Sequence, residues 1–470
     1  MTAVDTRVPE IRVFKKSNIK HQRMSSKPLA ADPTVLLLSR ASPFGIETGP
    51  YPLGQFAPGE ETIGFVRDSA RVLVIGAGGL GCEILKNLAL SGVRNIDVID
   101  MDTIDVTNLN RQFLFRVKDV GKMKAQVAAD FIMQRCPSTT VTAHTCMIQE
   151  KDEDFYRQFS VIIGGLDNIE ARRWLNSQLH DMLIYDGEEI NPASVIPFVD
   201  GGSEAFKGQA RVIIPGTTSC FDCTLDMFPP QVNFQLCTIA ETPRKPEHCI
   251  AYAMLAVQKS LAEGADSIAI RQAWEARFGD KTALDKDNAD HMVFLFEQAK
   301  NRAAKFRIEG VTLQLTSGVV KRIIPAIAST NAIIAAACVN EAWKYLGYSS
   351  HLLDNYMMFN GTTGVYSYTY RTEKKPDCLV CCRDLKKVEF SSKAMLQDLL
   401  DDLIAKFKFS KPSVSSTTTK LYIANPESLR KQTQGNLLKP LGSLMASGEV
   451  IVVTDPVFVQ AAEFEVILKD

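Results

Sequence analysis

The sequence lacks an excess of either charge, because 53 lysines and arginines stand against 54 aspartates and glutamates, a formal net charge of −1. Proteins that bind nucleic acids or membrane surfaces usually carry a clear basic excess. No apolar run approaches the roughly 20 residues that a membrane-spanning helix needs, and the most apolar stretch covers only residues 332–339. We therefore expect neither a nucleic acid nor a membrane as a partner.

A secretory signal is also lacking, since residues 1–30 are polar and mildly basic and contain no apolar segment. The chain has eleven cysteines, an odd number. In a large chain without a secretory signal, cysteines are usually reduced. We expect a cytoplasmic and/or nuclear protein whose cysteines serve as metal ligands, a nucleophile or core residues rather than as disulfides.

Short apolar segments alternate with amphipathic ones in the first half of the chain. This alternation is typical of a parallel sheet with crossover helices. The predicted strands cover residues 72–75, 95–100, 161–164 and 183–186, and the predicted helices cover 82–91 and 122–136. Helical patterns dominate from about residue 225 to 310, and apolar α/β character returns after residue 323. The pattern indicates a helical insertion within one α/β fold.

The last part of the chain contains one strongly amphipathic helix, predicted over residues 395–407, among several short strands. The Ser/Thr run at 413–419 is predicted to be a loop. The strands are expected at residues 387–390, 421–423, 450–453 and 464–468. One helix among short strands favours a small α+β or β-grasp module.

A glycine-rich turn separates the first predicted strand from the first predicted helix. Gly76, Gly78 and Gly81 match the pattern G-x-G-x-x-G, in which glycines allow close backbone approach and the helix N-terminus faces a phosphate. Asp100 ends the next strand, where a carboxylate can accept hydrogen bonds from ribose hydroxyls. Taken alone, this motif favours an NAD- or FAD-dependent oxidoreductase.

Further polar residues after the strands favour a triphosphate instead. Asn108, Arg111 and Gln112 follow the acidic strand end, Lys124 comes shortly after, and Asp167 follows the strand at 161–164. Two cations fit a triphosphate, and a carboxylate at a strand end fits Mg²⁺. A hydride-transfer site needs neither of them. The alternative for any single residue is solvated charge near a strand end.

These motifs together resemble the adenylation domain of the ubiquitin-like protein activating enzymes. The resemblance implies that Asp100 holds the ribose and that Asn108 and Arg111 contact phosphates. It also implies that Lys124 neutralises the phosphates and that Asp167 positions Mg²⁺. The same ATP site would include Gly76, Gly78, Gly79, Gly81, Asp102, Gln112 and Asn168.

Cys237 is the candidate nucleophile. Its flanks are polar, Arg244 and Lys245 are near in sequence, and a helix is expected to begin at Pro246, all of which favour a thiolate. The alternative is a small core residue. The stretch Cys-Thr-Ile-Ala and the later Pro-Glu-His-Cys-Ile resemble the active-site segment of the eukaryotic activating enzymes. This implies a thioester between Cys237 and a modifier's terminal glycine, with Thr238 in the same site.

Two Cys-x-x-C pairs, Cys220 with Cys223 and Cys378 with Cys381, offer four thiolates for a structural Zn²⁺ ion. A redox pair is the alternative, although neither pair begins a helix after a strand. Cys382 is an extra thiol that leaves the ligand register open. The family that the chain resembles carries zinc between these two loops.

Only one nucleotide motif is present, so the chain resembles the catalytic half of a two-chain activating enzyme. The segments 200–216 and 229–234 most resemble catalytic subunits of the neddylation (Rub) activating enzymes, with those of the SUMO-activating enzymes as the alternative. A scaffold that has lost the chemistry is a further alternative, but the motif residues are all present. Such subunits tend to carry leucine and tyrosine at Met227 and Phe228, where this chain departs.

The resemblance implies a fold, a set of partners and a domain order. The fold would be α/β, with a Rossmann-like adenylation domain and a parallel-rich sheet, a helical catalytic-cysteine insertion and a C-terminal β-grasp ubiquitin-fold domain. The partners would be a pseudo-symmetric regulatory subunit, the neddylation modifier and its conjugating enzyme. The expected parts are an arm at 1–60, the adenylation domain at 61–224 and 311–385, the catalytic-cysteine domain at 225–310 and the ubiquitin-fold domain at 386–470.

The resemblance also places Arg211 beside the channel for the modifier's C-terminal tail. Ubiquitin carries an arginine near the end of that tail, and the neddylation modifier carries an alanine there. Two cations about 4 Å apart at an effective dielectric constant near 20 repel by roughly 4 kcal/mol. We therefore predict that Arg211 selects the modifier by repelling ubiquitin, with a surface strand arginine as the alternative.

Overall fold

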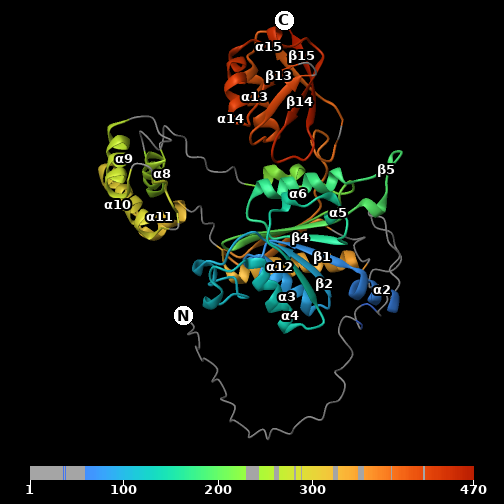
Figure 1. Cartoon of the computed structure of the whole chain (residues 1–470). Coiled ribbons are helices and arrows are strands. Elements are labelled where there is room, and N and C mark those ends of the chain that lie inside the picture. The colour runs from blue at the N-terminus through green and yellow to red at the C-terminus, as the bar shows by residue number, and fades with distance from the viewer. Residues whose placement is uncertain are drawn as a thin grey trace, which may run out of the picture.

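The computed structural model describes most of the chain. The described residues are Val35, Leu38 and 59–228, 243–258, 264–279, 282–286, 288–320, 326–347, 354–382, 384–416 and 419–469. Within these ranges, no helix is long and apolar enough to cross a membrane. Figure 1 shows three bodies: a sheet covered by helices, a separate group of helices, and a small C-terminal domain.

The largest body is built on an eight-stranded sheet with the order β10-β9-β8-β7-β4-β1-β2-β3. The strands β1, β2, β3, β4 and β7 run parallel to their neighbours, whereas β7 to β10 pair antiparallel. The strands are β1 Arg71–Ile75, β2 Asn95–Ile99, β3 Thr140–His144, β4 Val161–Gly164, β7 Phe198–Glu204, β8 Lys207–Ile213, β9 Tyr356–Asn360 and β10 Tyr366–Tyr370. The parallel-rich sheet that the sequence predicts is therefore confirmed.

Helices cover both faces of this sheet because its central strands are apolar on both sides. Val72 and Val74 of β1 lie in one buried cluster, and Leu73 and Ile75 lie in a second one on the opposite face. The first face is covered by α3 Gly79–Leu90, α4 Lys124–Arg135 and α12 Ala328–Leu346, and the second by α5 Glu153–Tyr156 and α6 Ile169–Asp181. The chain thus returns to the first face with α12 after the helical insertion.

The predicted strand at 183–186 is wrong in its placement. Only β5 Tyr185–Asp186 is extended, and it pairs with β6 Glu189–Ile190 in a separate two-stranded piece. Its side chains are exposed, so the segment lacks the two-sided burial of a strand in the large sheet. The remaining short helices of this body are α2 Glu60–Gly64, η1 Phe65–Ser69, η2 Val106–Asn108, η3 Val117–Asp119, η4 Ile148–Glu150, η5 Pro192–Ser194 and η6 Asp222–Met227.

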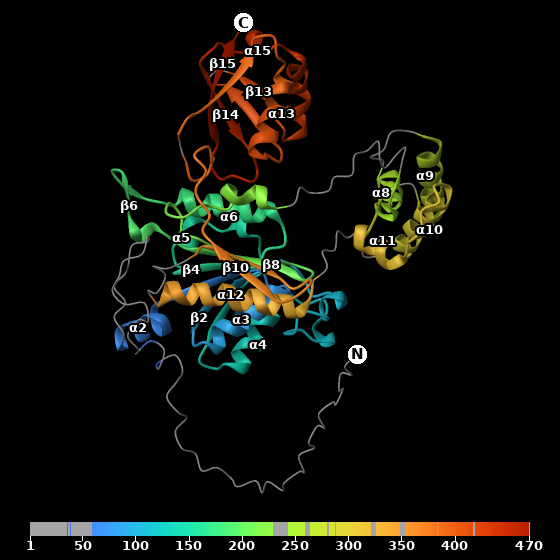
Figure 2. The ribbon, with the colours of Figure 1, turned by 180° about the vertical axis from the view of Figure 1, so that it is seen from behind.

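Four helices form the second body, which stands beside the sheet in two opposite views (Figures 1 and 2). They are α8 Pro246–Val257, α9 Ala265–Phe278, α10 Ala289–Lys305 and α11 Leu313–Val320. Pro246 lies in the first turn of α8, as predicted, where its missing N–H is harmless. Val320 belongs to the shared apolar core of these helices, so the helical unit continues past the boundary expected at 310.

The C-terminal body contains a five-stranded sheet with the order β11-β15-β14-β12-β13, in which only β11 and β15 are parallel. Its strands are β11 Lys386–Ser391, β12 Ser413–Ser416, β13 Lys420–Tyr422, β14 Glu449–Thr454 and β15 Ala462–Lys469. Its helices are α13 Leu396–Phe407, α14 Glu427–Thr433, η7 Gln434–Leu438 and α15 Leu441–Leu444. The helix α13 buries its apolar face on the sheet, which confirms the predicted amphipathic helix.

The prediction of a loop at 413–419 is wrong for its first half. Residues 413–416 form β12, which pairs with β13 on one side and β14 on the other. Val414 is fully buried, and its neighbours in the sheet supply the hydrogen bonds of the backbone. Pairing on both sides therefore outweighs the turn preference of a Ser/Thr run.

Candidate functional site

The glycine-rich turn lies at the carboxyl ends of β1 and β4, where two of its glycines are sterically required. Gly76 has a φ of 92°, and a Cβ there would lie 2.9 Å from the carbonyl oxygen of Gly165. A Cβ at Gly81 would overlap the carbonyl oxygen of Gly76. Gly78 is the N-cap of α3, and its Cβ position is nearly open. The turn therefore ends at the N-terminus of α3, the position that a phosphate-binding turn uses.

Asp100 ties this turn to the end of β2. Its Oδ2 accepts a hydrogen bond from the Ala77 backbone N–H at 2.7 Å, and its Oδ1 accepts one from the Asp102 N–H at 2.8 Å. Burial raises the pKa of the Asp100 carboxyl above its ordinary value, while these two backbone N–H donors lower it. The carboxylate predicted to hold a ribose is thus fixed against the predicted phosphate turn.

Lys124 and Asp102 form an ion pair next to this carboxylate. Lys124 is only 8% exposed at the first residue of α4, and its Nζ donates to Asp102 Oδ2 at 2.7 Å. Asp102 itself is exposed. The two residues that the sequence placed in one site are therefore together, joined by an ion pair.

Arg111 and Gln112 lie against the glycine turn. The Cγ of Arg111 is 3.5 Å from the position that a Cβ on Gly79 would take, and the Nε2 of Gln112 is 3.9 Å from that of Gly78. Gln112 is 3% exposed, and its Oε1 accepts no hydrogen bond from the described part of the chain. The turn thus has a buried amide and a guanidinium stem beside it.

Asn108 and Asn168 were predicted to bind a nucleotide. In the structure, their side chains make local capping hydrogen bonds. The Oδ1 of Asn108 accepts from the Asp105 N–H at 3.0 Å, which closes a capping box around η2. Asn168 is the N-cap of α6, and its Oδ1 accepts from the Ala171 N–H at 2.7 Å. The Nδ2 of Asn168 donates to the exposed Asp167, which follows β4 in the chain.

Asn331 is a residue of this site that sequence reasoning missed. It lies in the first turn of α12, is 2% exposed, and accepts a hydrogen bond from Ser203 Oγ at 2.5 Å. Its Nδ2 occupies the space that a Cβ on Gly79 would need. In the sequence, Asn331 stands out only as an amide directly before the most apolar stretch of the chain. Its place in the site depends on the fold, which brings α12 to the turn.

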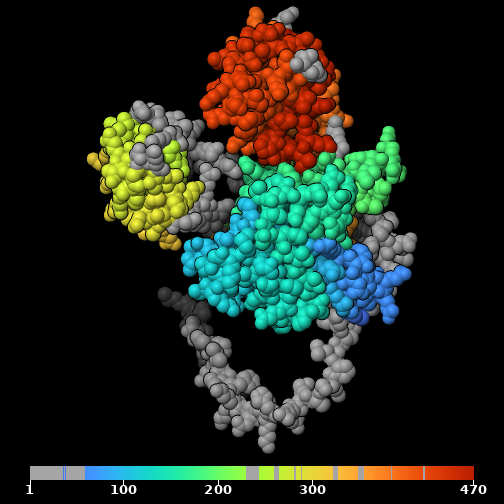
Figure 3. Space-filling model, in the orientation of Figure 1, coloured from blue at the N-terminus to red at the C-terminus, as the bar shows by residue number. Residues whose placement is uncertain are grey.

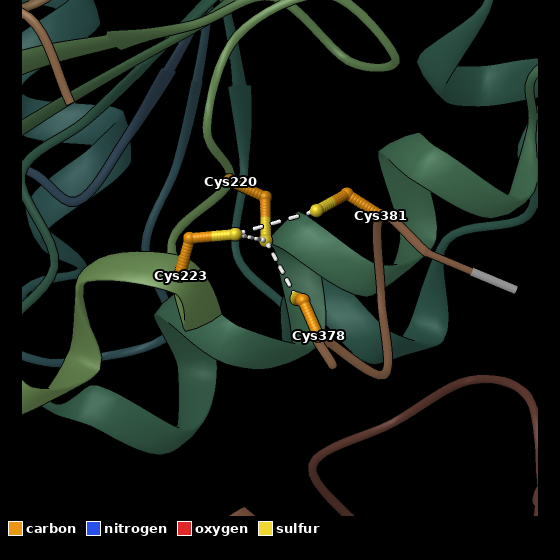
Figure 4. Close-up of side chains that lie close together, drawn as sticks. All are labelled: Cys220, Cys223, Cys378 and Cys381. Carbon is orange, nitrogen blue, oxygen red and sulfur yellow. Dashed lines mark hydrogen bonds between the residues drawn. The ribbon is translucent and has the colours of Figure 1, made fainter. Parts of the chain in front are cut away.

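The four cysteines of the two predicted pairs meet in one cluster (Figure 4). The Sγ atoms of Cys220 and Cys378 are 3.4 Å apart, and those of Cys223 and Cys381 are 3.3 Å apart. All four lie within 4.8 Å of one another. Sulfur atoms around a tetrahedral zinc ion, with bonds of about 2.3 Å, lie about 3.8 Å apart. The cluster therefore fits one metal ion of that kind.

Cys382, which left the ligand register open, is outside the cluster. Its Sγ lies 3.4 Å from Asp384 Oδ2 and 3.4 Å from Lys386 Nζ. The register is therefore Cys378 with Cys381.

Three other described thiols lie in apolar cores and are poor nucleophiles. Burial raises the pKa of Cys82 to about 12, and it also raises the pKa of Cys338 and of Cys249. A raised pKa lowers the thiolate fraction at neutral pH. Cys237 and Thr238, the predicted thioester site, lie outside the described residues.

Arg211 is buried in β8, which rules out the alternative of a surface strand arginine. The side chain is 2% exposed, and its Nε lies 3.3 Å from Asp200 Oδ2. Asp200 also pairs with Arg172 at 2.8 Å, so two guanidinium groups share one buried carboxylate. The Nη atoms of Arg211 donate to Thr224 and Gln209. Aromatic rings lie over the guanidinium carbon at 4.6, 5.0 and 5.1 Å, those of Phe221, Phe228 and Tyr356.

Two family models match the chain. The model of the ThiF family matches residues 59–380, and that of the E2 binding domain matches residues 389–468. The first match ends one residue before Cys381, and the second begins within β11.

Three curated relatives share the name NEDD8-activating enzyme E1 catalytic subunit. The one from Dictyostelium discoideum is 52% identical over 417 residues, which cover 87% of this chain and 91% of the relative. The one from Caenorhabditis elegans is 47% identical and covers 86% and 91%. The one from Schizosaccharomyces pombe is 46% identical and covers 87% and 91%. A crystal structure of Escherichia coli MccB with ATP is 18% identical, with a TM-score of 0.39, over 68% of this chain and 69% of that one.

Proposed function

The chain belongs to the ThiF family and, within it, to the NEDD8-activating enzyme E1 catalytic subunits, and from that premise we propose which of its residues carry out each step. It is an ATP-dependent enzyme that activates the ubiquitin-like modifier NEDD8. The alternative of a SUMO-activating subunit is not favoured, because the similar relatives carry the NEDD8 name. The observation that supports the chemistry best is the glycine turn joined to Asp100.

The first step is adenylation of the modifier's C-terminal glycine. A carboxylate oxygen of that glycine attacks the α-phosphorus of ATP, and the bond to pyrophosphate breaks. The N-terminal N–H groups of α3 and the cations Arg111 and Lys124 stabilise the charge that develops on the phosphates. Lys124 is held in place by Asp102 at 2.7 Å, so it needs little rearrangement when phosphate arrives. Asp100 accepts hydrogen bonds from the ribose.

Asp167 supplies the metal chemistry of this step in our proposal. Its exposed carboxylate at the end of β4 offers hard oxygen ligands that suit Mg²⁺, and Mg²⁺ neutralises phosphate charge when bound. Asn168 keeps this carboxylate at the first turn of α6 through the N-cap and through its hydrogen bond to Asp167. The four-cysteine cluster is proposed to hold a structural Zn²⁺ ion.

The second step is capture of the acyl group by Cys237. The thiolate attacks the carbonyl carbon of the acyl adenylate, a thioester bond forms, and AMP leaves with the electron pair. Arg244 and Lys245 are near in sequence and favour the thiolate. The three core thiols described above are unsuited to this role because burial raises their pKa values.

We propose two protein partners besides the modifier. We propose that the C-terminal domain recruits the conjugating enzyme that accepts the thioester, in agreement with the match to the E2 binding domain. A pseudo-symmetric regulatory subunit is proposed to complete the heterodimer, because the chain has one nucleotide motif. The proposed location is cytoplasmic and/or nuclear.

We still propose that Arg211 determines the choice of modifier, but as a buried and paired cation rather than an isolated one. The burial and the ion pair with Asp200 mean that the charge is partly neutralised, so the figure for two isolated cations is an upper bound. Arg172, Arg211 and Asp200 together carry a net charge of +1. This net charge still disfavours a further cation nearby.

A direct test combines the chain and its partner subunit with ATP, Mg²⁺ and a panel of ubiquitin-like modifiers, followed by non-reducing gels. The proposal predicts a reducible adduct with NEDD8 and much less with ubiquitin or SUMO. Adduct formation that does not depend on ATP, or that occurs equally with SUMO, contradicts it.

A further inference from the structure

One face of α6 is turned toward the C-terminal domain (Figure 1). Glu170, Arg173, Ser177 and Asp181 follow one another at helical spacings of three and four residues, so they lie along one side of the helix. Each contacts the C-terminal domain: Ser410 Oγ donates to Glu170 at 3.1 Å, the Val459 N–H donates to Ser177 Oγ at 3.1 Å, and Gln460 donates to Asp181. The contact between the two domains is thus organised by a single helix.

Arg173 is the most buried charged side chain of this face, at 3% exposure. Its Nη2 donates to the Phe407 carbonyl at 3.1 Å, and its Nη1 donates to the Lys408 carbonyl. These carbonyls lie at the C-terminal end of α13, where Lys408 has a φ of 56° and ends the helix. The last carbonyls of a helix have no partner within the helix. Arg173 satisfies two of them from the other domain, and Phe458 lies over its guanidinium at 4.7 Å.

The guanidinium of Arg173 is also bound by Asp222, a residue of the loop that carries Cys220 and Cys223. The Nε of Arg173 donates to Asp222 Oδ1 at 2.7 Å, and Asp222 lies between the ligands Cys220 and Cys223. Asn176, one turn along α6, donates to the other oxygen of Asp222 at 3.2 Å. Asp222 therefore links the cysteine loop directly to Arg173.

Two cavities lie beside these contacts, and Phe458 packs against the apolar cores of both domains. A cavity of about 350 Å³ is lined by Ser177, Asp181 and Gln460, and a second one of about 130 Å³ is lined by Asp222. Both are also lined by Phe458. Figure 3 shows the C-terminal domain seated over α6 as a separate lobe. Arg173 is buried beside these cavities and makes two hydrogen bonds across the contact.

We propose that Arg173 is a positioning residue that fixes the orientation of the C-terminal domain on the adenylation domain, and that the cysteine cluster holds Arg173 through Asp222. The planar guanidinium fork reaches two carbonyls and one carboxylate at once, which a lysine does not do. The consequence for catalysis rests on the proposed function: the orientation decides how a conjugating enzyme bound to the C-terminal domain meets the thioester.

The test measures orientation directly in the full-length, metal-loaded chain with its partner subunit. Dyes are placed by non-canonical amino acids at two exposed positions, Lys118 and Lys431, and single-molecule energy transfer gives the distance distribution. Arg173→Met should widen this distribution. The control is Arg157→Met, because Arg157 binds Glu153 and the Met182 carbonyl within the adenylation domain. That variant should keep the parental distribution.

The link to the cluster is tested with Asp222→Asn, which keeps all four cysteines. It should widen the distribution while metal content stays at the parental value. If Arg173→Met does not fold, Arg173→Lys replaces it with the same expected widening. Unchanged distributions in both the Arg173 and the Asp222 variants overturn the proposal.

A functional measurement separates positioning from a merely structural role. Transfer from Cys237 to the conjugating enzyme should change by about threefold or more in Arg173→Met, because small misplacements of reacting groups are costly. Pyrophosphate exchange and loading of Cys237 should stay at the parental level. If the unmodified protein shows no pyrophosphate exchange, that result instead contradicts the proposed function. A widened distribution with unchanged transfer overturns the positioning role.

Discussion

Asn331 shows how a single amide can join elements that are far apart in the sequence. It accepts a hydrogen bond from Ser203 of β7 and fills the space over Gly79 at the start of α3. The packing of α12 therefore requires a glycine at position 79. Loss of this amide leaves a small gap directly behind the nucleotide turn.

We predict that Asn331→Ala lowers NEDD8-dependent pyrophosphate exchange by about tenfold. The reason is that the Asn331 amide packs over Gly79 at the turn, and a loss of about 1.4 kcal/mol of transition-state stabilisation is tenfold in rate. Asn95→Ala is the matched control, because Asn95 donates to the Arg67 and Asp68 carbonyls away from the turn. Equal exchange in the two variants would show that Asn331 does not support the turn.

A second residue-scale prediction concerns Arg211. Replacing it with glutamine removes one positive charge from the buried group that it forms with Asp200 and Arg172, while Arg172 still pairs with Asp200. Discrimination against ubiquitin should fall by about tenfold, equal to about 1.4 kcal/mol. Loading of ubiquitin and of NEDD8 on Cys237 is compared by non-reducing gels. Arg277→Gln, an exposed change in α9, should leave the ratio unaltered, and an unaltered ratio in the Arg211 variant means that selection lies elsewhere.

At the scale of elements, the metal loops connect the large sheet to the C-terminal domain. Cys220 and Cys223 stand before and within η6, and the second pair lies directly before β11. A metal ion here would cross-link two segments that are 158 residues apart in the sequence. The stability of this junction should therefore depend on the metal.

We predict that the isolated chain holds about one Zn²⁺ ion and that Cys378→Ser loses it. The free energy of unfolding should fall by on the order of 3 kcal/mol or more, because metal binding is coupled to folding. Cys382→Ser is the matched control, since this thiol lies outside the cluster. Metal content is measured by mass spectrometry and stability by thermal unfolding. Equal metal content in both variants would contradict the assignment of the ligands.

The elements also show what sequence patterns can and cannot predict. The apolar runs at β1, β2 and β4, the glycine turn and the amphipathic α13 follow from local composition and spacing, and the structure agrees. The position of β12 does not, because a Ser/Thr run becomes a central strand only through its two neighbours. The burial of Arg211 and the closeness of Asn331 to Gly79 depend on contacts across the fold, which local patterns do not contain.

At the scale of the whole molecule, the C-terminal domain is joined to the rest through the cysteine loop and one face of α6. A chain that ends at residue 385 keeps all four cysteines and the Arg173–Asp222 pair. We predict that it exchanges pyrophosphate and loads Cys237 at the parental rate, yet fails to transfer the modifier. The gel assay with added conjugating enzyme checks this. Normal transfer by the shortened chain would place the recruitment of the conjugating enzyme elsewhere.

The central claim is that one chain adenylates the modifier at the glycine turn and then transfers it to Cys237. Cys237→Ala separates these two steps, and pyrophosphate exchange followed in parallel with a reducible adduct measures both. We predict NEDD8-dependent exchange at the parental rate and no reducible adduct in Cys237→Ala, and loss of exchange in Asp167→Ala. A reducible adduct that persists in Cys237→Ala, or undiminished exchange in Asp167→Ala, would contradict it.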